Sequence, residues 1–129
     1  MISLISIYAG GILTLFMAVF HTRFYVIFKW KEEFEKISSL NQRVFYTIHL
    51  FLTLIFIFIG ILSLVYAKEL SQCTGIAFGF NILIAIFWLI RTIWQVFYFK
   101  GGKLMHYALI IYFFLLYVSY SIPVVMKML

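Results

Sequence analysis

Four long runs without a charged residue constrain this chain more than any other feature. They cover residues 1–20, 44–67, 70–90 and 104–126. A helix needs about 20 apolar residues to cross the ~30 Å hydrocarbon core of a bilayer, so each run is long enough for one crossing. The runs lack the alternation that is typical of membrane barrel strands. The pattern predicts one all-α domain, an integral membrane protein built as an up-down antiparallel bundle of four transmembrane helices.

We expect the spans at about residues 2–27, 43–67, 71–99 and 103–126. In residues 28–40 the apolar positions recur at helical spacing between charges, which predicts an amphipathic extension of span one along the cytoplasmic surface. Ser39 or Asn41 is expected to cap span two. Residues 67–75 and the Gly101-Gly102 pair are expected to form short turns. The first run has its basic residues after it rather than before it, so it is interpreted as a retained span.

The basic residues are distributed unevenly along the chain. Only Lys68 and Lys127 belong to the end of the bundle that holds both termini, whereas the other eight belong to the opposite end. The positive-inside rule therefore places both basic connections in the cytoplasm and both termini outside. The net charge of +6 is a topology signal and does not indicate nucleic acid. The expected partners are the lipid bilayer and, because the chain is small, further copies or a larger membrane complex.

Polar residues of all four spans converge on the cytoplasmic leaflet. His21, His49, Arg91, Gln95 and His106 are expected about 4–14 Å inside the basic boundary at 1.5 Å per residue. Each belongs to a polar stripe of its helix, and polar stripes of membrane bundles face inward. The four stripes are Gly10, Thr14 and His21; Tyr46, His49 and Thr53; Asn81, Trp88, Arg91, Thr92 and Gln95; and His106, Phe113, Tyr117 and Tyr120. Arg23 lies about 200° from His21 and is expected to snorkel to the headgroups.

These polar residues suggest a binding site. We expect Arg91 to face a pocket shared with His21, His49, Gln95 and His106, the candidate cofactor-binding set. Neutral imidazoles suit Zn, Cu or Fe, which makes His21, His49 and His106 candidate metal ligands. Spans two and four are diagonal in an up-down bundle, so His49 and His106 can instead be axial ligands of haem b, with Arg91 pairing a propionate. Electron transfer or metal handling is the resulting functional hypothesis.

Several chemistries are excluded, and others stay open. The only acids, Glu32, Glu33, Glu35 and Glu69, lie outside the spans, which excludes a buried carboxylate relay or a carboxylate-bridged di-iron centre. The single Cys73 belongs to the end opposite the histidines, and no hydrolytic or nucleophilic motif is visible. The alternatives are an oligomeric transporter or channel for an anion or lipid-like substrate, a non-catalytic subunit of a membrane complex, and an enzyme acting on lipids.

Overall fold

Four long helices make up most of the computed structural model, which describes residues 1–99 and 102–129. They are α1 (Ile2–Thr22), α4 (Ser39–Val65), α6 (Ile76–Phe97) and α7 (Leu104–Met128), and each is long and apolar enough to cross a membrane. Three short helices join them: α2 (Phe24–Ile27), α3 (Trp30–Phe34) and α5 (Ala67–Gln72). The predicted four-helix membrane bundle is confirmed. Part of the predicted Gly101-Gly102 turn lies outside the described residues.

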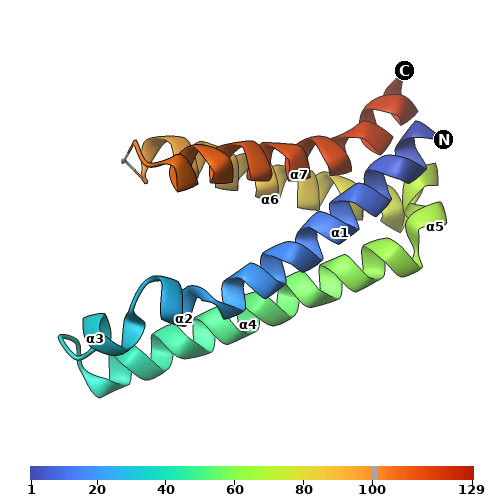
Figure 1. The fold of residues 1–129 in the computed structure, drawn as a ribbon. Helices are drawn as coiled ribbons and strands as arrows, with labels where there is room; N and C mark the ends of the chain where they lie inside the picture. Colours follow the sequence, from blue (N-terminus) through green and yellow to red (C-terminus); the bar gives the residue numbers. More distant parts are fainter. Residues whose placement is uncertain (100–101) are drawn as a thin grey trace.

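The long helices form two antiparallel hairpins. α1 packs along α4, α6 packs along α7, and α1 also packs on α7. Figure 1 shows both termini beside α5 at one end, which we call the terminal end. The opposite end carries α2, α3 and the start of α7, and we call it the basic end. The two hairpins meet at the terminal end and spread apart toward the basic end (Figure 1).

Glycines bring the helices close together in the terminal half. A Cβ added to Gly10 of α1 would lie 2.8 Å from the ring of Tyr120 in α7. One added to Gly60 of α4 would lie 2.6 Å from the side chain of Leu15 in α1. Small residues let membrane helices approach closely and gain dispersion energy that lipid does not supply. α1 can therefore approach α4 and α7 this closely only because Gly10 and Gly60 have no side chains.

A buried hydroxyl links three helices at the same level. Tyr120 is fully buried, and its hydroxyl lies 2.7 Å from Ser63 Oγ of α4 and 3.4 Å from Thr14 Oγ1 of α1. Further toward the terminal end, Asn81 Nδ2 of α6 donates to the carbonyl of Leu70 in α5 at 2.8 Å. Asn81 therefore ties α5 to the bundle rather than joining the polar groups of the basic end.

The connections differ from the sequence-based expectation in three places. Residues 67–75, expected as a plain turn, contain α5. The expected extension of span one breaks, because Lys29 adopts a left-handed conformation (φ 49°) between α2 and α3. Ser38, rather than Ser39 or Asn41, caps α4, and its Oγ accepts a hydrogen bond from the Asn41 N–H at 3.3 Å.

Trp30 explains why the connection folds back on α4. Its ring is buried and lies 4.8 Å from the ring of Phe45 and 4.7 Å from the ring of His49, both in α4. Phe34 stacks on Trp30 at 5.3 Å. The apolar face of the connection thus covers α4, which a continuous extension of α1 would leave bare.

Candidate functional site

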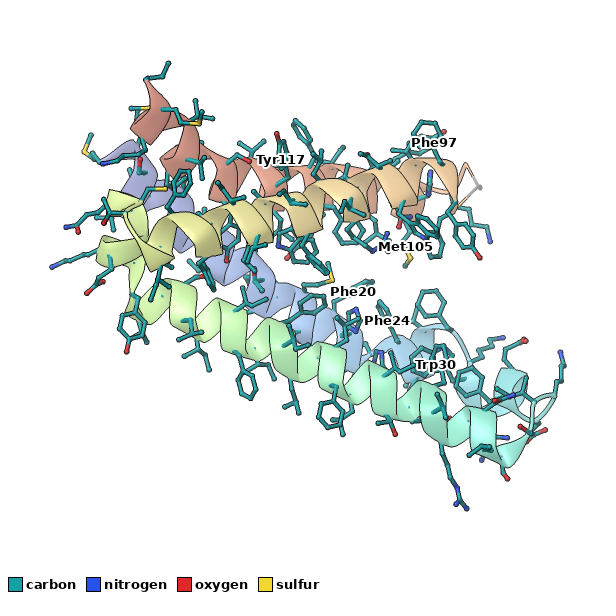
Figure 2. The ribbon with its side chains drawn as sticks, turned by 180° about the vertical axis from the view of Figure 1, so that it is seen from behind. Phe20, Phe24, Trp30, Phe97, Met105 and Tyr117 are labelled. Atoms are coloured by element: carbon teal, nitrogen blue, oxygen red, sulfur yellow. The ribbon has the colours of Figure 1, made fainter. Side chains whose placement is uncertain are left out.

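A cleft of about 500 Å³ lies between the two hairpins at the basic end. Figure 2 shows Phe24 and Trp30 of one hairpin and Met105 of the other on the two sides of the space between them. Its walls are mostly apolar, and its polar side chains all come from α6 and from the start of α7. The lining residues are Phe24, Phe28, Trp30, Phe45, Arg91, Gln95, Phe99, Lys103, Met105, His106 and Leu109.

Arg91 is the one charged residue of α6. Its guanidinium carbon lies 4.3 Å from the ring centroid of Phe113 and 5.2 Å from that of Phe99. Each such cation–π contact is worth about 0.5–2 kcal/mol. Among the described residues, its buried Nη1 atom has no hydrogen-bond partner. Arg91 is therefore held by aromatic rings while at least one of its donors remains free to bind an acceptor.

The four long helices contain no carboxylate that could form an ion pair with Arg91. Glu32 and Glu33 belong to α3, Glu35 follows it and Glu69 belongs to α5. In the described part of the chain the one ion pair joins Glu33 to Lys36, at 3.7 Å on the exposed surface. A charge inside the hydrocarbon costs up to about 2.5–3.5 kcal/mol on insertion scales, the value at the centre of a membrane helix. An anion from outside the chain would offset that cost.

A smaller chamber of about 80 Å³ adjoins the cleft on the side of the terminal end. Arg91, Phe24 and Leu109 line both spaces. Trp88, one turn before Arg91 in α6, lines the chamber and stacks between Phe56 of α4 at 5.4 Å and Phe113 of α7 at 5.7 Å. These three stacked rings bridge the hairpins where the cleft ends.

Two more nitrogens at the chamber lack partners among the residues that the structure describes. They are Trp88 Nε1 and His21 Nδ1, and both are buried. Trp88 Nε1 is an obligate donor, whereas His21 Nδ1 donates or accepts according to its tautomer. With Arg91, three side chains around one small space thus have unused hydrogen-bonding nitrogens. Most of the other lining residues are hydrocarbon or aromatic side chains.

His49 has a structural partner instead. Its Nε2–H donates to the backbone carbonyl of His21 at 2.8 Å, and the two imidazole rings stack at 4.8 Å. α1 ends at Thr22, so this carbonyl belongs to the last turn of the helix, where a backbone N–H of the cap also bonds to it. His49 therefore caps the end of α1. It lines neither the cleft nor the chamber.

His106 pairs with Gln95 across the second hairpin. The Gln95 Nε2 amide donates to His106 Nδ1 at 3.1 Å, which places the imidazole proton on Nε2. Gln95 is almost fully buried, and its Oε1 has no hydrogen-bond partner within residues 1–99 and 102–129. Both side chains line the cleft together with Arg91 and Lys103.

Four of the five predicted site residues thus line the cleft or the chamber. Arg91, Gln95 and His106 share the cleft, Arg91 and His21 share the chamber, and His49 lies outside both. In the part of the chain that is described, no group of three or more His, Cys, Asp or Glu side chains is placed to hold a metal ion. The three-histidine metal site therefore finds no support among the described residues, whereas the His49–His106 haem pair stays a prediction.

Sequence reasoning missed the residues that shape the cleft. Leu109 lies three residues after His106 and four before Phe113, on the same face of α7, but an apolar residue there resembles any packing residue. Trp30 and Phe99 carry no signal that separates a cleft wall from a lipid-facing ring. Comparison of the chain with protein-family models, with curated proteins and with solved structures finds no match.

Proposed function

We propose that this membrane protein binds an amphiphile with an anionic head, a carboxylate or a phosphate, and that the head binds Arg91 in the cleft between the hairpins. One observation carries the proposal. The guanidinium lies against two aromatic rings, its Nη1 has no partner among the described residues, and no acid occurs in the four long helices. An anion supplies what the chain lacks, since arginine binds carboxylates and phosphates with two parallel hydrogen bonds.

The other polar residues of the cleft suit the same head. Lys103 contributes a second cation, Gln95 an amide and His106 an Nε2–H donor, and neither the cleft nor the chamber is lined by an acid. The remaining walls are apolar, which suits the part of an amphiphile next to its head. The basic end lies where span ends meet the headgroups, so such a molecule reaches the cleft from the leaflet.

Transport of the bound molecule is the second candidate, favoured by the one-sided shape of the cleft. The cleft lies at the basic end, whereas the Trp88 stack and the Tyr120 hydroxyl network join the helices toward the terminal end. Transporters expose a central site to one side at a time by rocking two helical units against each other. Flux of a bound amphiphile across proteoliposomes separates transport from binding alone: activity lost in Arg91→Gln supports transport.

Binding of haem b or of a Zn, Cu or Fe ion stays a prediction from the sequence. An absorption spectrum and elemental analysis of the protein purified in mild detergent test it. A Soret band that is lost in His49→Ala establishes haem, and stoichiometric metal without colour establishes a metal site. Either result would replace the amphiphile proposal, since haem propionates or a metal-bound anion would then account for Arg91.

The direct experiment is a binding titration by native mass spectrometry. Oleate and phosphatidic acid are the anionic probes, phosphatidylcholine is the zwitterionic control and inorganic phosphate is the head alone. A hydrogen bond to a charged group is worth about 1.5–3 kcal/mol, so Arg91→Gln should weaken an anionic amphiphile about 10- to 100-fold.

Arg23→Gln is the matched control. Arg23 is exposed at the end of α1, and its substitution removes the same charge as Arg91→Gln. It should leave the affinity unchanged. Equal loss in both variants would reduce the effect to surface charge and overturn the proposal. Inorganic phosphate that binds as tightly as phosphatidic acid would show a site for free anions rather than for amphiphiles.

A further inference from the structure

We infer that the hydrocarbon tail of the bound amphiphile leaves the cleft sideways, through an apolar groove between α1 and α7 whose inner wall is Leu109 and Met105. This inference rests on the proposed function and names the exit that the tail takes. The groove has a volume of about 370 Å³. Its lining residues are Phe16, Met17 and Phe20 of α1 with Met105, Ala108, Leu109 and Tyr112 of α7.

The groove is built for hydrocarbon. Tyr112 carries its only side-chain hydroxyl, and that hydroxyl donates to the backbone carbonyl of Leu13 in α1. This bond joins α1 to α7 on the side of the terminal end. From Met105 to Tyr112 the groove follows α7 for about 10 Å at 1.5 Å per residue. Phe16 on its rim is 63% exposed, so within a membrane the groove opens to lipid.

One side chain borders all three spaces. Leu109 lines the cleft, the chamber and the groove, and Met105 lines both the cleft and the groove. Met17 and Phe20 line the chamber and the groove. The side chains that separate the head space beside Arg91 from the lipid-facing groove are therefore aliphatic apart from Phe20, and on the α7 side they are Met105 and Leu109. Methionine and leucine change rotamer more readily than stacked rings, so this wall can yield to a chain.

The opposite seam, between α4 and α6, offers a poorer exit. There Phe56 of α4 lies 5.4 Å from the ring of Trp88 and 6.3 Å from the ring of Phe87, both in α6. A tail on that side must separate stacked aromatic rings, which are worth about 0.5–1.5 kcal/mol per pair beyond their buried area. The groove between α1 and α7 requires no such separation.

A photocrosslinking experiment locates the tail. The probe is palmitate with a diazirine in the middle of its chain, bound to the full-length protein in nanodiscs and mapped by peptide mass spectrometry. We expect adducts on residues 16–20 and 105–112, reduced at least tenfold in Arg91→Gln and unchanged in Arg23→Gln. Adducts on Leu52 or Phe87 that depend on Arg91 would overturn the exit while leaving the proposed function intact.

Adducts in the groove that persist in Arg91→Gln would identify ordinary surrounding lipid and overturn the exit. If the titration also shows no dependence on Arg91, the proposed function fails as well, so the two failures remain distinct. Ala108→Trp provides an independent measurement, because Ala108 lines the groove but neither the cleft nor the chamber. Filling the groove should weaken palmitate about tenfold and octanoate less than twofold, since a short tail stays within the cleft.

Leu115→Trp is the matched control for that variant, because Leu115 is exposed on α7 and lines none of the three spaces. It should leave both affinities unchanged. Equal affinities of palmitate for Ala108→Trp and for the wild type, or equal weakening of palmitate and octanoate, would contradict a tail lying in the groove.

Discussion

The two ends of the same four helices are built from different residues. At the terminal end, Gly10 and Gly60 bring α1 against its neighbours, and the hydroxyl of Tyr120 bonds to Ser63. At the basic end, aromatic side chains hold the hairpins apart around a cleft. Of the five buried side-chain atoms without a partner in the described residues, four belong to His21, Trp88, Arg91 and Gln95 at the cleft and its chamber.

This difference suggests that the terminal end stabilises the bundle, whereas the basic end binds a ligand. Buried polar atoms without partners lower stability by about 1–3 kcal/mol each, so they are retained where another function needs them. The terminal end pairs its tyrosine hydroxyl and packs closely, which holds the bundle together. The basic end leaves donors unpaired beside open volume, which is the arrangement a ligand requires. Changes at the two ends should therefore affect different measurements.

The largest effect is expected from a side chain added at the terminal end. Gly10→Val would place atoms within 2.8 Å of the Tyr120 ring and 3.1 Å of Ser119 Cβ. Overpacking costs about 1–3 kcal/mol, and displacing Tyr120 also removes its interhelical hydrogen bonds at about 0.6 kcal/mol each. We expect the free energy of unfolding, measured by thermal unfolding in detergent, to fall by about 2–4 kcal/mol.

Gly79→Val is the control for this variant, because a Cβ on Gly79 of α6 meets nothing within 4 Å. The free energy of unfolding of Gly79→Val should differ from that of the wild type by less than about 1 kcal/mol. Equal losses from Gly10→Val and Gly79→Val would mean that α1 does not pack closely against α7.

Filling the cleft should stabilise the bundle from the other end. A ligand that binds only the folded protein at 100 times its Kd adds about 2.7 kcal/mol. Saturating oleate should therefore raise the unfolding midpoint of the wild type and of Gly10→Val alike, and should not raise that of Arg91→Gln. An equal rise in Arg91→Gln would place the oleate elsewhere.

Tyr120→Phe should have a smaller effect on the terminal end. It removes the hydroxyl that bonds to Ser63 and keeps the ring that packs on Gly10. Interhelical hydrogen bonds in membranes average about 0.6 kcal/mol and reach about 1.7 kcal/mol, so we expect a loss of about 1 kcal/mol. A double-mutant cycle with Ser63→Ala checks the pairing, and strict additivity would show that the two hydroxyls do not interact.

The smallest effect on binding is expected from His49→Phe. The aromatic stack on His21 is kept, while the hydrogen bond to the last turn of α1 is lost, at about 0.5–1.5 kcal/mol. Affinity for oleate should stay within twofold of the wild type, because His49 lines neither space. A tenfold loss of affinity would place His49 in the binding site after all.

Much of the fold could be predicted from the sequence, because the position of a span and the buried face of a helix depend on the order of residues within a single segment. Uncharged runs reveal the spans, and the stripe of Gly10, Thr14 and His21 correctly indicates the buried face of α1. The break at Lys29 was not predictable in this way, since it depends on Trp30 packing against α4.

The site was harder to predict, because a polar stripe does not reveal its partners. Asn81 and Arg91 share a stripe of α6, yet Asn81 binds the Leu70 carbonyl while Arg91 faces the cleft. The histidine pattern likewise did not distinguish His49, which caps α1, from His106, which lines the cleft. The opening of the hairpins arises from the contrast between glycines at one end and rings at the other, which only the packed helices reveal.

The most direct measurement is the identity of the molecules that copurify with the protein in mild detergent, determined by mass spectrometry for the wild type, Arg23→Gln and Arg91→Gln. We predict that the wild type and Arg23→Gln each retain about one anionic amphiphile per chain and that Arg91→Gln retains none. The same lipids in the same amounts in all three preparations would contradict a binding site for an anionic head at Arg91.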